Sequence, residues 1–341
     1  MGLKAMTVLV TGGGGYIGSH MVLELVDAGE RVVVLDNLST GFAWAVAEGV
    51  PLVVGDCGDQ ALVARLIRDH GVEAIIHFAA SVVVPESVRD PLGYYRNNTV
   101  NSRALIECAV KSGIRRFIFS STAAVYGDPA QIPVKEDAPT QPTSPYGWSK
   151  LMSEIMLRDA ARAHGLSHLI LRYFNVAGGD PRRRAGQSSE TATHLIKLAV
   201  ETALGSRPRL DVFGTDYPTA DGTCIRDYIH VSDLARAHSD ALRYLRSGGP
   251  SLTLNCGYGR GFSVLEVIET VKRVSGVDFK VERAPRRPGD PARIVADSSA
   301  ARAVLGWQPR FDDLSVIIEH ALAWERELMR RRSAAAQVKR A

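Results

Sequence analysis

Residues 7–20 read TVLVTGGGGYIGSH, a short apolar run that leads directly into glycines. Gly12, Gly15 and Gly18 have the spacing GxxGxxG. The apolar run predicts a buried strand, and the glycines predict a tight turn into a helix. Such a turn lets a diphosphate approach the amides at the start of the helix, because no Cβ atom stands in the way. The stretch therefore indicates a nucleotide-binding βα unit of the Rossmann type.

Apolar runs and helix-like stretches continue to alternate as far as residue 175. Further strands are predicted at 31–35, 51–54, 74–78, 116–120 and 169–173. This alternation is typical of an α/β fold with a doubly wound parallel sheet, and we predict such a domain over residues 1–175. A glycine-, arginine- and proline-rich stretch at 178–186 then precedes amphipathic segments and shorter strands. We expect a smaller α/β domain, mainly for substrate, over residues 176–329 and a flexible tail over 330–341.

Composition excludes several classes of protein. The chain has 341 residues, 45% hydrophobic and 23% charged, and its net charge of +4 is too small to predict a nucleic-acid partner. No apolar run reaches the roughly 18 residues of a membrane span, and no secretory signal precedes the first strand, so we expect a cytoplasmic protein without a membrane partner. The four cysteines lie far apart with no Cys/His cluster, which predicts buried thiols and no metal site.

The ends of the next strands indicate which dinucleotide is bound. Asp36 ends the second strand, 18 positions after Gly18. A carboxylate at this place accepts hydrogen bonds from the adenosine ribose hydroxyls and repels a 2′-phosphate, which favours NAD over NADP. The third and fourth strands end in GDC (55–57) and HFAA (77–80), and the small residues of HFAA let a cofactor lie against the backbone.

Hydroxyl groups gather where the strand at 116–120 ends, which is the edge where open α/β sheets bind ligands. Thr122 follows this strand, and Tyr146 and Lys150 lie on one face of a helix predicted to begin at Ser144-Pro145. An ammonium beside a phenol, together with the positive ring of NAD+, lowers the phenol pKa from about 10 toward neutrality. We therefore predict that Tyr146 removes a hydroxyl proton while NAD+ takes a hydride from the same carbon, and that Thr122 hydrogen-bonds that oxygen.

With these motifs the chain resembles the extended short-chain dehydrogenases/reductases, and within them the nucleotide-sugar 4-epimerases, over nearly its whole length. The resemblance rests on TGGGGYIGSH (11–20), LDNLS (35–39), GD (55–56), HFAA (77–80), YYRNN (94–98), FSSTAAVYGD (119–128), SPYGWSK (144–150), LRYFNVAG (171–178), FGTDYPTADGTCIRDYIHV (213–231) and RRPGDPARIVAD (286–297). It implies NAD-dependent interconversion of UDP-glucose and UDP-galactose, a reaction of galactose metabolism. The implied steps are oxidation at C4, rotation of the 4-keto intermediate and re-reduction, and the two UDP-N-acetylhexosamines are further candidate substrates.

The resemblance also implies roles by position. The predicted NAD-binding residues are Gly12, Gly15, Tyr16, Ile17, Gly18, Asp36, Asn37, Asp56, Cys57, Phe78, Ala79, Asn97, Tyr146, Lys150 and Tyr173. The predicted catalytic residues are Thr122, Tyr146 and Lys150. The predicted UDP-sugar ligands are Thr122, Tyr146, Asn175, Leu195, Phe213, Arg226, Tyr228, Arg287, Asp290 and Ile294. The two arginines suit a diphosphate, because a guanidinium is a permanently charged fork.

Two positions depart from the family pattern, and one face is a candidate for assembly. Val82 stands where some members carry a lysine, so no cationic role is predicted there. Ile294 stands where certain glucose-restricted members carry a tyrosine, which leaves the breadth of substrates open. The family further implies a homodimer built from two helices of the NAD domain. Leu105-Ile106 and Cys108-Ala109 offer an apolar face for it, although packing in the core explains these residues equally well.

Four other functions are compatible with parts of the sequence. A UDP-pentose 4-epimerase would need the same catalytic residues. A 4,6-dehydratase needs acid/base carboxyl groups directly after the catalytic hydroxyl, where this chain has Ala123 and Ala124, and Asp36 disfavours the NADPH of a sugar reductase. A non-catalytic NAD-sensing regulator would keep the glycine turn without needing Thr122, Tyr146 and Lys150.

Overall fold

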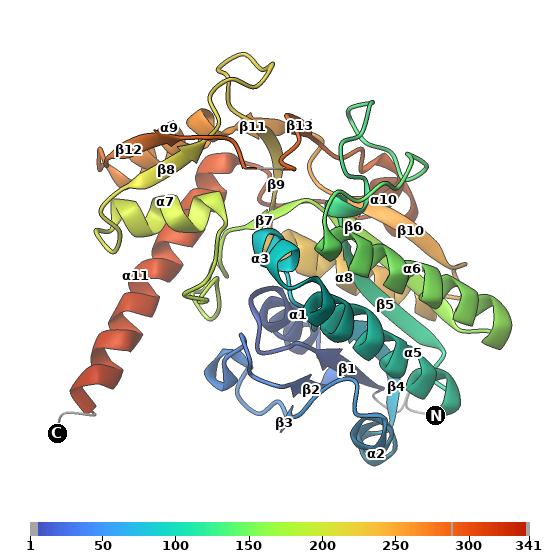
Figure 1. Cartoon of the computed structure of the whole chain (residues 1–341). Coiled ribbons are helices and arrows are strands. Elements are labelled where there is room, and N and C mark those ends of the chain that lie inside the picture. Colours follow the sequence, from blue (N-terminus) through green and yellow to red (C-terminus); the bar gives the residue numbers. More distant parts are fainter. Residues whose placement is uncertain (1–5, 288, 339–341) are drawn as a thin grey trace.

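A computed structural model describes residues 6–287 and 289–338, and a seven-stranded parallel sheet forms its centre (Figure 1). The strands lie in the order β10-β6-β5-β4-β1-β2-β3, and every neighbouring pair is parallel. Their bounds are β1 (Thr7–Thr11), β2 (Arg31–Asp36), β3 (Leu52–Val54), β4 (Val72–His77), β5 (Arg116–Thr122), β6 (Ser167–Tyr173) and β10 (Leu252–Cys256). The predicted α/β fold with a doubly wound parallel sheet is confirmed, and each of the six predicted runs overlaps one strand.

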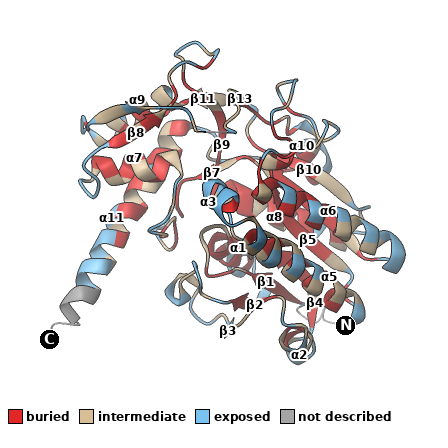
Figure 2. Ribbon diagram, in the orientation of Figure 1, coloured by how far each residue is buried: buried red, intermediate tan, exposed pale blue. Residues whose placement is uncertain are grey.

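Helices cover both faces of this sheet, which explains why its central strands are apolar throughout. On β1, Val8 and Val10 pack toward one face and Leu9 toward the other, and none of the three is exposed. One face is covered by α1 (Tyr16–Asp27), α8 (Val231–Arg246) and α10 (Ser299–Leu305), and the other by α2 (Gln60–His70), α5 (Asn101–Lys111) and α6 (Pro145–His164). Figure 2 shows the buried residues concentrated on the sheet and on the inward sides of these helices.

Short helical segments connect β4 to α5 and begin the turn after β5. They are α3 (Val84–Arg89), α4 (Pro91–Tyr94), the π-helix η2 (Tyr95–Val100) and the 3₁₀ turn η3 (Ala123–Val125), with a further 3₁₀ turn, η1 (Ala43–Ala45), after β2. Helix α6 begins as its sequence predicts: Ser144 is the N-cap and accepts a hydrogen bond from the Gly147 amide at 3.2 Å, and Pro145 occupies the first turn. This cap places Tyr146 in the first turn of α6, beside the end of β5.

The remaining elements form a second, smaller α/β unit. Strands β7 (Asn175–Ala177), β9 (Ile225–His230), β11 (Gly261–Ser263) and β13 (Arg293–Ile294) make one sheet, and β8 (Leu210–Phe213) pairs with β12 (Val281–Ala284). Helices α7 (Leu195–Ala203), α9 (Val264–Ser275) and α11 (Leu314–Val338) pack around a shared apolar core. Because α8 and β10 return to the first sheet, the chain alternates between the two units, and the domain boundary at 175/176 stays a prediction.

Part of the segment predicted as a flexible tail, 330–341, is helical in the structure, and its flexibility stays a prediction. Helix α11 continues through Val338, and residues 339–341 lie outside the described part of the chain. Arg331 explains the continuation, since its guanidinium lies over the rings of Trp44 and Trp324 at 5.5 and 5.1 Å from their centroids. These tertiary contacts favour an ordered helix where composition alone favoured a tail.

The structure decides between the two explanations of the apolar face on α5, dimer contact and core packing. Leu105, Ile106, Cys108 and Ala109 all lie in the core between α5 and the sheet, at 4% exposure or less. The apolar stripe of α5 therefore packs inside the chain. Within residues 6–287 and 289–338, no helix is long and apolar enough to cross a membrane.

Candidate active site

The glycine turn between β1 and α1 packs against the end of β4. Gly12 has a φ of 74°, and a Cβ atom there would lie 2.6 Å from the Ala79 amide nitrogen. A Cβ on Gly18 would lie 2.0 Å from the Gly12 carbonyl oxygen. Gly15 caps α1 with no side-chain hydrogen bond, so the first-turn amides of α1 can bind an anion. This turn fits the diphosphate of a dinucleotide.

Carboxylates lie at the same edge of the sheet. The two Asp36 oxygens accept hydrogen bonds from the Gly14 and Leu38 amides, each at 2.8 Å. Asp56 accepts hydrogen bonds from the Gly58 amide at 2.7 Å and from Asn101 Nδ2 at 2.9 Å. These bonds fix both carboxylates but leave lone pairs for ribose hydroxyls, so the residues present fit the adenosine half of NAD.

Several predicted NAD residues have structural partners as well. The Tyr16 hydroxyl donates to the Gly178 carbonyl at 2.8 Å and so ties α1 to the end of β7. Asn97 Nδ2 donates to Ser81 Oγ at 2.9 Å. The Cys57 thiol belongs to the hydrophobic core, and burial raises its pKa to about 12. That thiol packs within the core and is held in its neutral form.

The remaining predicted NAD residues lie along the same edge of the sheet or support it. Phe78 follows β4 and packs on the His238 ring at 4.8 Å between centroids, and Tyr173 ends β6. Ile17 packs on the core below the glycine turn, and Asn37 accepts a hydrogen bond from the Ser39 amide at 3.0 Å.

The three predicted catalytic residues meet at the carboxyl end of β5. Thr122 ends β5, and its Oγ1 accepts a hydrogen bond from the Ala124 amide at 3.1 Å. Tyr146, which is 7% exposed, is hydrogen-bonded to Thr122. Lys150 is buried, and its Nζ donates to the Ser120 carbonyl at 2.9 Å. A proton acceptor, a hydroxyl partner and a cation are thus gathered at one place.

Burial controls the ionisation of this group. It raises the pKa of Tyr146 to about 12, against the opposing effect of the hydrogen bond from Thr122. It lowers the pKa of Lys150 to about 8, although the Glu154 carboxylate acts in the opposite direction. The predicted lowering of the Tyr146 pKa is therefore not produced by the protein alone, because desolvation of the phenolate outweighs the hydrogen bond from Thr122.

Sequence reasoning missed the residues that hold this group in place. Asn98, in the π-helix η2, accepts a hydrogen bond from the Ser81 amide at 2.8 Å and donates one to Ser149 Oγ at 3.0 Å. It therefore joins the loop after β4 to α6. Glu154 and Arg172 form a buried ion pair at 2.6 Å, and Glu154 also accepts from Ser121 Oγ. The motif YYRNN (94–98) contained a signal for Asn98, but only the neighbouring Asn97 was assigned a role.

The predicted UDP-sugar ligands surround the second unit's small sheet. Arg226 on β9 lies 3.5 Å from Asp290, and the Arg287 guanidinium lies 3.8 Å from the centroid of the Phe213 ring. Asn175 on β7 is in register with the buried Tyr228 on β9, and Leu195 begins α7.

Ile294 connects this region to the catalytic turn. It is in register with Arg226 and packs in one apolar cluster with Ala123 and Val125, directly after Thr122. The cluster places the small sheet beside the catalytic residues.

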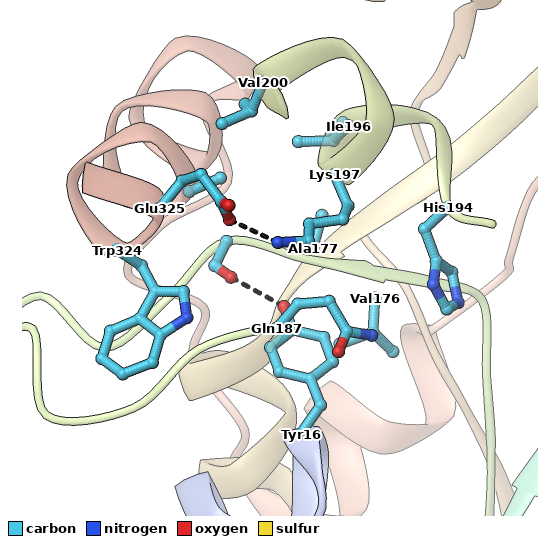
Figure 3. Close-up of a pocket in the computed structure, with 12 residues that line it drawn as sticks. Tyr16, Val176, Ala177, Gln187, His194, Ile196, Lys197, Val200, Trp324 and Glu325 are labelled. Carbon is cyan, nitrogen blue, oxygen red and sulfur yellow. Dashed lines mark hydrogen bonds and ion pairs between the residues drawn. The ribbon is translucent and has the colours of Figure 1, made fainter. Parts of the chain in front are cut away.

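A separate cavity lies between the start of α1, β7, α7 and α11 (Figure 3). Tyr16, Gln187 and His194 line it, and Lys197 forms an ion pair with Glu325 at its edge. None of the predicted catalytic residues lines this cavity, so the chemistry is assigned to the end of β5. Within residues 6–287 and 289–338, no group of three His, Cys, Asp or Glu side chains is placed to hold a metal ion.

The fold and the site together define an enzyme of the short-chain dehydrogenase/reductase class. A model of the NAD dependent epimerase/dehydratase family matches residues 8–257. UDP-glucose 4-epimerase of Azospirillum brasilense is 59% identical over 94% of this chain and 92% of its own length. The chain belongs to the NAD dependent epimerase/dehydratase family and, within it, groups with the UDP-glucose 4-epimerases.

Solved structures agree with this assignment. UDP-glucose 4-epimerase from Brucella ovis in complex with NAD is 44% identical, with a TM-score of 0.91 over 94% of this chain and 98% of that one. The UDP-Glc/GlcNAc 4-epimerase from Campylobacter jejuni is 49% identical, with a TM-score of 0.82 over 94% of this chain and 99% of that one.

We expect the buried Lys150 to make stability depend on pH in the NAD-free protein. Its folded pKa of about 8 lies below the ordinary 10.5, so between these values the unfolded chain binds the proton and the folded chain does not. Stability from this group therefore rises with pH across that window, by up to about 3 kcal/mol. Urea unfolding of the NAD-free wild type and of Lys150→Met at the two pH values should show the free energy of unfolding of the wild type rising relative to that of the variant, since other titrating groups act equally in both. Equal pH dependence in both proteins would contradict the lowered pKa.

Proposed function

We propose that this protein acts in the cytoplasm and interconverts UDP-glucose and UDP-galactose by NAD-dependent epimerisation at C4. The observation that carries the proposal is the meeting of Thr122, Tyr146 and Lys150 at the end of β5, on the sheet edge that also bears the glycine turn and Asp36. Membership of an NAD-dependent epimerase family supports the same reaction.

Each catalytic residue has a distinct task. NAD, when bound, supplies the hydride acceptor and donor for sugar C4. Tyr146 takes the proton of the C4 hydroxyl and returns it after the sugar has turned. Thr122 hydrogen-bonds the same oxygen, and Lys150 supplies positive charge that favours the phenolate. The Ser120 carbonyl orients the Lys150 ammonium, since it accepts its hydrogen bond at 2.9 Å.

Epimerisation also requires that the nucleotide stays bound while the sugar rotates. Arg226 and Arg287 are the proposed diphosphate ligands, and Asn175, Leu195, Phe213, Tyr228 and Asp290 are the proposed contacts of the uridine. In the structure both arginines are held by protein groups, Arg226 by Asp290 and Arg287 by the Phe213 ring. A diphosphate is a stronger partner for a guanidinium than an aromatic face, so ligand binding can recruit them.

The rival reactions are separated by one assay. The purified protein is incubated with UDP-galactose, UDP-N-acetylgalactosamine or UDP-arabinose, without added cofactor, and the products are identified by chromatography. We expect UDP-glucose from UDP-galactose. Turnover of the pentose alone would favour a pentose epimerase, and loss of water from the sugar would favour a dehydratase.

Substitution of Tyr146 tests the proton acceptor. Tyr146→Phe keeps the ring but removes the hydroxyl, so we expect turnover of UDP-galactose to fall roughly 10²- to 10⁴-fold with UDP affinity nearly unchanged. Initial rates and calorimetric titration with UDP measure the two effects. Tyr244→Phe, near the end of α8, is the matched control. Near-normal turnover in Tyr146→Phe would remove this residue from the mechanism.

We further propose that the protein accepts UDP-N-acetylgalactosamine. A relative at 49% identity is named a UDP-Glc/GlcNAc 4-epimerase. Ile294, at 6% exposure beside Ala123, fills less space next to the catalytic turn than a tyrosine would. Space near the sugar is the property that decides whether an acetamido group fits.

Ile294→Tyr should therefore abolish turnover of UDP-N-acetylgalactosamine and largely spare that of UDP-galactose, because a steric clash discriminates more strongly than one lost apolar contact of about 1–3 kcal/mol. Rates with both substrates give the answer, and the UDP-galactose rate shows that the variant is folded. Ile294→Leu, which adds no ring, should keep both activities. The idea fails if the wild-type protein converts UDP-galactose but not UDP-N-acetylgalactosamine.

We also propose a homodimer, with an interface on α6 in place of α5. Trp148, Met152 and Ile155 lie on one side of α6 and are 41%, 38% and 44% exposed. Light scattering should give about twice the 36.9 kDa chain mass. The double substitution Met152→Glu and Ile155→Glu should give a monomer. A wild-type monomer at micromolar concentration would count against the interface.

A further inference from the structure

The segment after β2 rests on the glycine turn. We name residues 40–45 the cover loop. Its Phe42 amide donates to the Gly14 carbonyl at 2.9 Å, and a Cβ on Gly41 would lie 3.0 Å from both Asp36 carboxylate oxygens. The cover loop therefore lies directly against the groups that fit the cofactor, and a dinucleotide held by these groups leaves more easily when the loop moves away.

The C-terminal helix holds the cover loop in this position. The Trp44 ring stacks on Trp324 of α11, with 6.1 Å between centroids and 25° between planes. Phe42 packs on the Trp44 ring at 5.0 Å, and the Arg331 guanidinium lies over both tryptophans. Trp324 is 2% exposed and Trp44 is 45% exposed, so a fixed residue of α11 supports a residue of the loop.

The same helix holds a second segment beside the turn. Residues 186–189 line a narrow cavity together with Gly14, Gly15 and the cover loop. The Trp324 ring packs against Gly186, where a Cβ atom would lie 2.2 Å from ring atoms, so the absence of a side chain makes room for the ring. Arg332 donates to the Ser188 carbonyl at 3.2 Å and lies 3.3 Å from Glu190. Both walls of the cavity thus contact residues 324–332 of α11, about two turns of the helix.

We propose that Trp44, Trp324 and Arg331 form a clasp that slows the release of NAD, with Trp324 and Arg331 as positioning residues that act from the C-terminal helix. The inference rests on the proposed function only in taking NAD as the bound cofactor. An enzyme that uses and regenerates its cofactor in every cycle gains from slow release. Trp324 lies 306 residues along the chain from Gly18 of the glycine turn, so the clasp joins parts of the sequence that are far apart.

The test measures NAD release from the holoprotein. The variants are Trp44→Ala and Arg331→Ala, whose side chains are both partly exposed. Arg330→Ala is the matched control. The Arg330 side chain is 66% exposed and, among the described ion pairs, it pairs only with Glu327. The released NAD is quantified over time after dilution into an enzyme that consumes free NAD. Loss of one aromatic or cation–π contact should speed release roughly 2- to 10-fold, and Trp44→Phe should restore most of the slow release.

Thermal unfolding of the NAD-free proteins separates positioning from general stability. We expect unchanged midpoints for Trp44→Ala and Arg331→Ala beside their faster release. Release as slow as in the wild type, or an equal increase in Arg330→Ala, overturns the clasp. A wild-type protein that holds no NAD overturns it together with the cofactor assignment, whereas one that holds NAD but does not epimerise overturns only the proposed function.

Discussion

The contact between the glycine turn and the end of β4 is the constraint on which the rest of the site depends. Main chain meets main chain there, since a Cβ on Gly12 would lie 2.6 Å from the Ala79 nitrogen and one on Gly18 would lie 2.0 Å from the Gly12 oxygen. Only glycine allows this approach. It brings the start of α1, with its unbonded amides, to the carboxyl edge of the sheet. It also places the Gly14 amide where Asp36 can accept its hydrogen bond.

The catalytic residues follow from the same edge. Parallel strands end together, so β5 delivers Thr122 beside the ends of β1 and β4, and the Ser144 cap starts α6 at that level. Burial raises the pKa of Tyr146 and lowers that of Lys150. It therefore disfavours the phenolate and the ammonium, which are the two charged forms that the proposed chemistry uses. The positive charge of a bound NAD+ would offset this cost and favour the ionised Tyr146 and Lys150.

Local sequence predicted the sheet and the meeting of Thr122, Tyr146 and Lys150 because both depend on short patterns. Periodicity identifies buried strands, and the pairing of Tyr146 with Lys150 is visible within one helical turn. Local sequence predicts less where distant residues decide the outcome. Residues 330–338 have the composition of a tail, yet Arg331 meets Trp44 from the other end of the chain. The apolar stripe of α5 indicates that this face is covered, but the stripe alone does not show whether the sheet or a second subunit covers it.

The two ends of the site differ in how firmly the protein holds them. At the chemical end, Lys150 is fixed by the Ser120 carbonyl, and Asn98 ties the loop after β4 to α6 through bonds to Ser81 and Ser149. At the nucleotide end, Arg226 donates to the Ile225 carbonyl at 2.9 Å, but its carboxylate partner Asp290 lies 3.5 Å away and is 38% exposed. Epimerisation needs this division, because the proton acceptor must meet C4 from one fixed place while the sugar presents first one face and then the other. In the proposed mechanism, fixed catalytic residues and arginines that bind the diphosphate would together allow the sugar to turn without loss of the nucleotide.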